Sequence, residues 1–175
     1  KLHNLKHHTL FFENDLDEHI DSIYEDKKWP EKPLFYACCP SKTDDDVAPE
    51  GKENLFLLMP LATGINDEEV VREKYLEEMI SRLEKNIGVT DLISKIVYKR
   101  SYCVSDFITD YNAYAGNAYG LANTLGQTAV WKPKIRNKKL KNLYYTGQLT
   151  VPGPGVPPSI ISGKIVANEI NNQKN

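Results

Sequence analysis

The C-terminal part of the chain constrains the fold most, because a short apolar segment breaks into glycines and prolines and then continues with a helical apolar pattern. This segment is 143–159, LYYTGQLTVPGPGVPPS. We expect a strand that ends at Gly147 and a helix that opens near Pro157, since a proline's missing N–H costs nothing in the first helical turn. Such a unit places backbone N–H groups and the positive end of a helix beside the turn. Gly153 and Gly155 lack a Cβ, which leaves room for a planar ring near the main chain.

A dinucleotide-binding loop is the competing interpretation of this turn, because 153–158 (GPGVPP) imitates the G-x-G-x-x-G pattern up to its last position. Proline stands where the third glycine permits close packing, and neither a second strand nor an acidic ribose ligand follows. An ordinary connection that binds nothing stays open, since a lone glycine pattern is weak. The helix after the turn is expected to be buried because it is largely apolar, with Ile160, Ile161, Ile165, Val166 and Ile170.

The preceding part of the chain alternates predicted strands and helices. Apolar runs predict strands at 9–12, 34–39 and 55–61, and alternation predicts another at 93–103. A short helix is expected within 14–26, where apolar residues recur at helical spacing: Leu16, Ile20, Ile23 and Tyr24.

A longer helix is predicted after 66–69 (NDEE), which is a capping-box variant, and it is expected to stop at Gly88. Residues 106–132 are expected to be irregular. This order of elements predicts an α+β fold, close to α/β, with a mixed sheet and covering helices.

Composition narrows the function classes. With 175 residues and 41% hydrophobic content, the chain can bury one sizeable core. A net charge of −2 gives no polycationic surface, which argues against nucleic-acid binding. The longest apolar stretch, 55–62, is far shorter than the roughly 20 residues that cross a bilayer.

No metal ligand set is assigned from the sequence. The three cysteines fit neither a disulfide framework nor zinc-site spacing, which favours the reducing cytoplasm. His7 and His8 would point to opposite faces of a strand and would not chelate one ion. Asp44, Asp45 and Asp46 fit a solvated turn better than a calcium loop.

Seven motifs in order along the chain resemble the bacterial-type phytoene desaturases (phytoene dehydrogenases) of carotenoid biosynthesis. In addition to these seven, the C-terminal segment 143–159 resembles the flavin-contacting motif of that family. The landmarks upstream of it cover nearly the whole chain: 7–12 (HHTLFF), 33–36 (PLFY), 40–44 (PSKTD), 48–51 with 54–60 (APEG and NLFLLMP), 116–120 (GNAYG), Gln127, and 131–133 (WKP).

The resemblance implies an FAD-dependent enzyme that dehydrogenates phytoene or a similar long isoprenoid polyene by hydride transfer to flavin. Residues 1–140 would then be part of a substrate-binding domain, and 141–175 the C-terminal strand-turn-helix of the FAD-binding domain. It implies that Tyr114 and Tyr119 contact the substrate. The cofactor-binding residues that it implies are Gly147, Gln148, Pro152, Gly153, Gly155, Val156 and Pro157.

Two departures from the family pattern qualify this expectation. Gln148 is uncharged and not small, whereas relatives in the wider flavoprotein group often carry an acidic residue there and desaturases often carry a small one. The family's N-terminal glycine-rich dinucleotide-binding unit does not occur in these residues, and the chain begins with Lys1 rather than methionine. We therefore expect a C-terminal fragment whose partner is that other half, and which by itself binds FAD weakly or not at all and has no turnover.

Several alternatives stay open. The chain could be a non-catalytic isoprenoid- or lipid-binding module, a flavin amine oxidase-like enzyme, or a carotenoid saturase or isomerase. Asp106, Asp110 and His8 are of a suitable type for a catalytic base, but nothing in the sequence gives any of them a partner, so none is assigned. An apolar substrate makes peripheral membrane contact an expectation as well.

Overall fold

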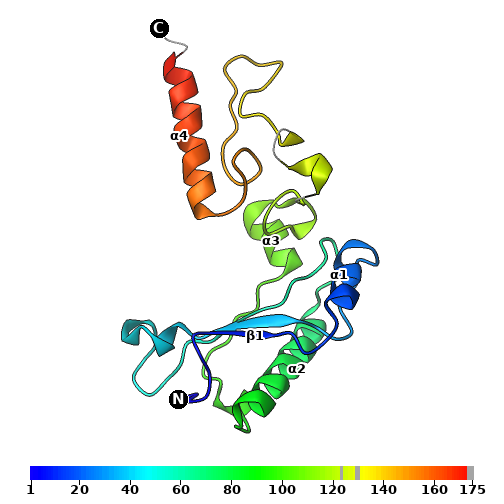
Figure 1. Ribbon diagram of the computed structural model, residues 1–175, viewed down its shortest axis with the longest axis vertical. Coiled ribbons are helices and arrows are strands. Elements are labelled where there is room, and N and C mark those ends of the chain that lie inside the picture. The colour runs from blue at the N-terminus through cyan, green and yellow to red at the C-terminus, as the bar shows by residue number, and fades with distance from the viewer. Residues whose placement is uncertain (123, 129–130, 173–175) are drawn as a thin grey trace. The chain divides into compact units, whose positions relative to one another are not determined.

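The computed structural model describes residues 1–122, 124–128 and 131–172, and it consists of two compact units (Figure 1). Unit 1 is Lys1–Gly116 and unit 2 is Asn117–Asn175. Helices and a sheet occur in one chain, so the α+β class is confirmed. The sheet itself is antiparallel throughout rather than mixed.

Unit 1 is built on a sheet of three antiparallel strands in the order β1-β2-β3. The strands are His8–Phe11, Phe35–Cys38 and Phe56–Leu58, close to the predicted apolar runs. In register, Phe11 pairs with Phe35, and Ala37 lies between Thr9 and Leu57. Because side chains alternate along a strand, these residues share one face of the sheet.

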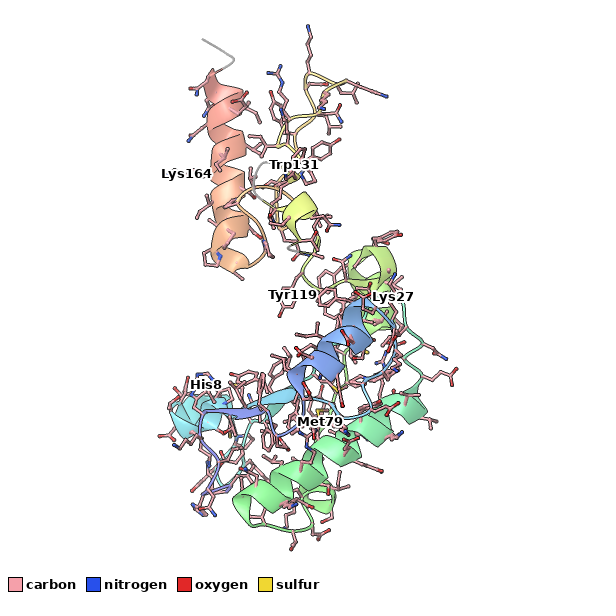
Figure 2. The ribbon with its side chains drawn as sticks, turned by 45° about the vertical axis from the view of Figure 1, so that its right-hand side comes forward. His8, Lys27, Met79, Tyr119, Trp131 and Lys164 are labelled. Carbon is pink, nitrogen blue, oxygen red and sulfur yellow. The ribbon has the colours of Figure 1, made fainter. Side chains whose placement is uncertain are left out.

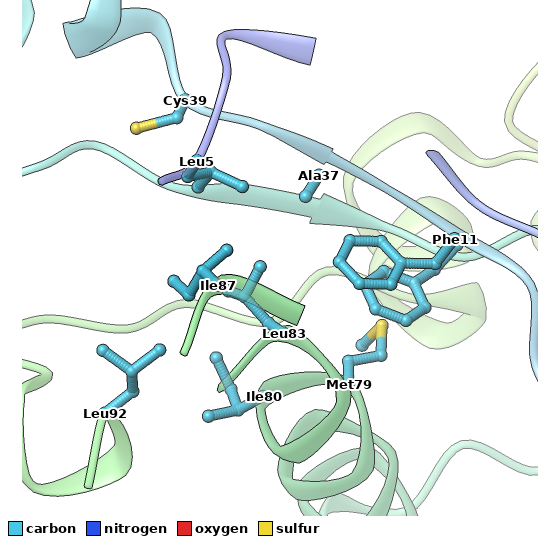
Figure 3. Packing of buried hydrophobic residues seen from close by; sticks show 10 residues of the cluster. Leu5, Phe11, Ala37, Cys39, Met79, Ile80, Leu83, Ile87 and Leu92 are labelled. Atoms are coloured by element: carbon cyan, nitrogen blue, oxygen red, sulfur yellow. The ribbon is translucent and has the colours of Figure 1, made fainter. Parts of the chain in front are cut away.

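The long helix α2, Glu69–Ile87, covers that face of the sheet, with Met79 directed toward the strands (Figure 2). Figure 3 shows Phe11 and Ala37 facing the α2 side chains, and the Phe11 and Phe35 rings stack with centroids 4.2 Å apart. The core cluster consists of Leu5, Phe11, Phe35, Ala37, Cys39, Met79, Ile80, Leu83, Ile87 and Leu92. Burial of this cluster is the main stabilising contribution to unit 1.

The two ends of α2 differ in how well the sequence predicted them. Gly88 ends the helix in the left-handed conformation, with φ of 69°, as expected. The capping box was a wrong prediction, because Glu68 is the N-cap and no side chain caps the first turn. The Asn66 amide instead donates to the Glu68 carboxylate at 2.8 Å, which takes both side chains away from the helix amides.

Helix α1, Leu16–Tyr24, forms within the predicted range but buries polar rather than apolar residues. The His19 ring is 3% exposed; its Nδ1 accepts from the Leu34 N–H at 2.8 Å and its Nε2 donates to the Pro60 carbonyl at 2.9 Å. Leu16, Ile20 and Tyr24 face solvent, at 39% exposure or more. His19 therefore joins α1 to two other segments of unit 1.

The predicted strand at 93–103 is wrong. The segment holds only the 3-10 turn η3, Ile93–Lys95, and two of its apolar side chains, Val97 and Tyr98, are at least 75% exposed. The expectation that 106–132 is irregular is also wrong at its start, where α3 spans Val104–Tyr111. Alternation without a neighbouring strand edge does not produce a strand, because the ladder bonds have no partner.

A buried ion network holds α3 against α2. The Arg72 guanidinium lies 2.7 Å from Asp67 Oδ2 and 2.7 Å from Asp106 Oδ2. The Ser105 N–H donates to the same Asp67 oxygen at 2.9 Å. Although burial opposes it, the Ser105 N–H and the Arg72 charge lower the pKa of Asp67.

Unit 2 contains the 3-10 turn η5, Leu125–Gln127, and the helix α4, Val156–Asn172. The helix opens one residue before Pro157, close to the prediction. The predicted strand ending at Gly147 is reduced to an isolated bridge between Arg136 and Tyr144. Among the described residues, no helix is long and apolar enough to span a membrane.

The prediction that α4 is buried is wrong for this structure. Ile160 is 69% exposed, Ile161 48%, and the other isoleucines of the helix 37%. Ser162 is the one buried residue that α4 contributes in the part of the chain that the structure describes. Unit 2 therefore covers the apolar residues of this helix only in part.

Candidate functional site

The candidate cofactor site is the turn 147–157 of unit 2, which we call the glycine-proline turn. Its three glycines have φ values that residues with a side chain rarely adopt: 103° at Gly147, 140° at Gly153 and 107° at Gly155. The Val151–Pro152 peptide is cis. The glycines are thus required by the backbone path of the turn itself, whatever it binds.

Ser162 fixes the start of the turn to α4. Its hydroxyl is fully buried, accepts from the Gly147 N–H at 2.8 Å, and donates to the Ser159 carbonyl at 2.7 Å. Thr146 Oγ1 lies 2.7 Å from the same hydroxyl. A second threonine, Thr150, closes the turn from the other side, donating from Oγ1 to the Gly147 carbonyl at 3.0 Å. Neither Ser162 nor Thr150 was predicted from the sequence, although each lies in or beside the motif.

The turn also offers open space and a positive charge. A Cβ built on Gly147 meets nothing within 4 Å, so a ligand atom fits where a side chain would stand. A Cβ on Gly153 would lie 3.0 Å from the Nζ of Lys132, and Lys132 is only 8% exposed. Lys132 belongs to the 131–133 landmark, which was the signal that could have identified it.

The N-terminus of α4 is a weaker anion site than the sequence suggested. Pro157 and Pro158 have no N–H, and the Ser159 N–H donates to the Gly155 carbonyl at 3.0 Å. Of 156–159, only the Val156 N–H is therefore left to face a ligand. The positive end of the helix and the Lys132 ammonium supply the remaining electrostatic attraction for a negative group.

The predicted site residues are only partly brought together. The seven cofactor-binding candidates all lie in the glycine-proline turn or on the first two residues of α4; Gly153 is buried, Gln148 half-buried, and Pro152, Val156 and Pro157 exposed. Of the substrate candidates, Tyr114 (90% exposed) belongs to unit 1 and Tyr119 (65% exposed) to unit 2. Each of these tyrosines is exposed within its own unit, and their contact with the substrate stays a prediction.

An apolar surface that sequence reasoning missed lies in unit 1. The face of the sheet opposite α2, which we call the outer sheet face, carries Leu10, Tyr36 and Leu58 side by side in register. Leu10 is 65% exposed and Phe56 51% exposed. Strand alternation could have identified this surface, since each apolar run has apolar residues at both its odd-numbered and its even-numbered positions.

The three groups considered for a catalytic base are all occupied within unit 1. Asp106 pairs with Arg72 and accepts from the Cys103 N–H at 2.8 Å, and Asp110 accepts from the Tyr102 hydroxyl at 2.7 Å. Partial burial and the Asp110 carboxylate raise the pKa of Tyr102. His8 Nδ1 lies 2.5 Å from the Tyr36 hydroxyl. No catalytic base is assigned.

The comparisons with known proteins give one consistent result. A carotenoid 3,4-desaturase of Haloarcula japonica is 46% identical over 166 residues, which cover 95% of this chain and 33% of that protein. A 4,4'-diapophytoene desaturase (4,4'-diaponeurosporene-forming) of Staphylococcus aureus strain Newman is 32% identical over 169 residues, covering 93% of this chain and 34% of that protein. No family model matches the sequence.

These matches agree with the resemblance carried by the seven motifs, and they confirm that the chain is related to the carotenoid desaturases. The chain spans about a third of the length of the curated relatives it matches. The resemblance places that third at the C-terminal end. The chain therefore belongs to the carotenoid desaturase family and corresponds to one portion of such a protein.

Proposed function

We propose that this chain is the portion of an FAD-dependent carotenoid desaturase that contacts the flavin ring and helps to line the substrate site. The observation that carries the proposal is the 46% identity, along 95% of the chain, to a carotenoid 3,4-desaturase. FAD, when bound, would supply the acceptor for a hydride from the polyene. The substrate would be phytoene or a similar long isoprenoid.

The glycine-proline turn fits a flavin ring. The open space at Gly147 supports close approach of a planar group. The residues proposed to hold the cofactor are Gly147, Gln148, Pro152, Gly153, Gly155, Val156 and Pro157. The dinucleotide-binding half of the protein is the proposed partner for the rest of FAD, so the 175-residue chain by itself is proposed to bind FAD weakly or not at all and to have no turnover.

Lys132 is proposed to favour the negatively charged, reduced form of the ring, because its ammonium is buried beside Gly153. In the full-length protein, Lys132→Met should shift the flavin midpoint potential to more negative values. The matched control is Lys134→Met, which changes an exposed lysine two residues away. Equal midpoint potentials in wild type and Lys132→Met, measured by spectroelectrochemistry, would contradict the proposed role of Lys132 beside the flavin.

The outer sheet face, together with Tyr114 and Tyr119, is proposed to contact the apolar substrate. Leu10, Phe56 and Tyr36 offer apolar and aromatic area without a cover from unit 1. On this proposal 1–140 is part of the substrate-binding domain and 141–175 completes the FAD-binding domain. Cytoplasmic location with peripheral membrane contact is part of the proposal, since the substrate dissolves in lipid.

The experiment is expression of the full-length gene in phytoene-producing cells, with identification of the pigment by chromatography and mass spectrometry. Products that have lost pairs of hydrogens support the proposal. A variant Gly147→Leu should lose at least about tenfold in flavin content, since a side chain occupies the open space and strains a φ of 103°. The matched control is Gly126→Leu, where a Cβ also meets nothing but the backbone is not left-handed.

A non-catalytic isoprenoid-binding module is the second candidate, favoured by the exposed apolar outer sheet face. A full-length protein that binds the polyene, purifies without flavin and leaves the pigment unchanged would establish that candidate and exclude the first. A full flavin content in the Gly147→Leu variant would contradict the proposal that the flavin binds at the glycine-proline turn.

A further inference from the structure

We propose that His7, His8 and Cys38 form a binding site for a transition metal ion of the zinc class. One ring nitrogen of each histidine and the Cys38 Sγ all lie within 4.8 Å of one another. The three residues belong to unit 1, at the end of the sheet where β1 begins and β2 ends, and Figure 2 labels His8 there. This proposal does not depend on flavin or on desaturation.

The pairing of β1 with β2 brings His8 and Cys38 together. They are directly opposite in register, and the neighbouring Cys39 N–H donates to the His7 carbonyl at 2.8 Å. His8 and Cys38 therefore occupy a position without mutual ladder bonds, where side chains of an antiparallel pair lie closest. His8 Nδ1 is 3.9 Å from the Cys38 Sγ.

His7 joins the same side because it stands outside the strand. Strand alternation would make the two histidines diverge, but β1 begins only at His8, so alternation does not govern His7. The two rings are 4.2 Å apart between centroids and tilted by 37°. The prediction that the two side chains point to opposite faces of a strand is therefore wrong.

A neighbouring hydroxyl prepares His7 as a ligand. Thr43 Oγ1 donates to the Pro40 carbonyl at 3.4 Å, so toward His7 Nδ1, 2.7 Å away, it acts as an acceptor. On this proposal the proton sits on Nδ1, and Nε2 keeps its lone pair for the metal. A second hydrogen bond of this kind, which fixes the tautomer and the ring, is typical of histidines that bind metals.

The ligand set selects the metal class. Two imidazoles and one thiolate suit Zn²⁺ or Cu⁺ and do not suit Mg²⁺ or Ca²⁺, which take oxygen ligands. With metal–ligand bonds of about 2.0–2.3 Å, the ligand atoms would have to approach by roughly 1 Å, which the exposed His8 ring permits. A water or the Tyr36 hydroxyl would take the fourth position. Binding would clip β1 to β2 and to the turn that carries Thr43.

The test is calorimetric titration of Zn²⁺ into the intact protein after a chelator has removed bound metal. We expect saturable binding of one ion, weakened more than about 100-fold in Cys38→Ser and in His8→Ala, and about 10–100-fold in Thr43→Val, which removes only the supporting acceptor. His3→Ala is the matched control, since it removes another exposed histidine outside the cluster. Circular dichroism establishes that each variant is folded.

A Co²⁺ titration gives a readout that a loss of stability does not imitate. Bound Co²⁺ should show a thiolate charge-transfer band that is present in His3→Ala and absent in Cys38→Ser. Absence of saturable Zn²⁺ binding, equal affinity in wild type and the folded Cys38→Ser or His8→Ala variant, or a Co²⁺ complex without the thiolate band would each overturn the proposal. The flavin content of the same preparations reports separately on the desaturase proposal.

Discussion

The two units of this chain are held together in different ways. Unit 1 has an apolar core between a sheet and α2, in which Phe35, Leu83 and Ile87 are at most 2% exposed. Among the described residues of unit 2, the large apolar side chains are exposed or half-buried, and the buried side chains are polar: Lys132, Thr150 and Ser162. One unit is stabilised by burial of its own apolar surface, and the other by hydrogen bonds that give a short turn its shape.

This difference bears on function. A unit whose own residues bury its apolar surface meets the usual condition for independent stability. A unit with an apolar helix in solvent resembles one side of an interface, because exposed apolar surface of this kind marks contact sites. On the proposed function, the cover for α4 is the dinucleotide-binding half of the desaturase.

The largest effect is expected for Leu83→Ala in the core of unit 1. Leu83 is fully buried, so truncation should cost about 2–5 kcal/mol of unfolding free energy through lost burial and the cavity left behind. The measurement is chemical denaturation followed by circular dichroism. Val70→Ala on the same helix is the control, since Val70 is 79% exposed and its change should stay within about 0.5 kcal/mol. A loss below about 1 kcal/mol for Leu83→Ala would mean that unit 1 does not depend on this core.

The next effect concerns Glu53, a polar anchor within unit 1. Its side chain is 8% exposed, and its carboxylate accepts from Lys42 Nζ at 2.7 Å, from the Ser41 hydroxyl at 2.5 Å and from the Leu2 N–H at 3.1 Å. Burial opposes ionisation, but these three donors lower the pKa of Glu53 to about 2, from an ordinary value of 4.5.

Because the folded pKa lies below the unfolded one, this stabilisation is complete above pH 4.5 and is lost as the pH falls toward 2. It amounts to at most about 3 kcal/mol. Glu53→Gln should therefore destabilise unit 1 at neutral pH, and the gap to wild type should narrow below pH 4.5. Glu50→Gln, at an exposed position, serves as control and should leave the pH profile unchanged. A gap that stays constant from pH 7 to pH 3 would contradict the assignment.

The smallest effect is expected for Ser162→Ala in unit 2. Removing the hydroxyl leaves the Gly147 N–H without its acceptor, which should cost about 1–3 kcal/mol locally. Hydrogen exchange of the Gly147 amide should accelerate, while amides in α2 keep their protection. Ser159→Ala, one helical turn earlier, is the comparison. Unchanged exchange at Gly147 would show that the turn keeps its shape without this hydroxyl.

Sequence reasoning succeeded where a predicted element finds its packing partner within unit 1. The strands near 9–12, 34–39 and 55–61 pair with each other, and α2 ends at Gly88 as the left-handed cap requires. The apolar face of α2 packs on the sheet that these three strands form. Local pattern and tertiary partner agreed, so the prediction was confirmed.

The predictions failed where the partner was missing or where a polar contact outweighed a pattern. The segment 93–103 alternates but has no strand edge beside it, and 143–147 forms a single bridge. In α1 a histidine took the buried position because it satisfies two backbone groups. For the candidate site, the glycines could be read from the sequence, whereas Lys132, Ser162 and the meeting of His7 with Cys38 depend on contacts that spacing does not reveal.

The parity of β2 has one further consequence. Its even-numbered side chains point away from α2 while Phe35 and Ala37 pack against the helix. On the proposed function, Leu10, Tyr36 or Leu58 can therefore change to suit polyenes of different length or polarity without disturbing the residues that keep the fold intact. Substitutions on the outer sheet face should therefore cost little stability. An insertion of one residue in β2, by contrast, would exchange the side chains of the two faces.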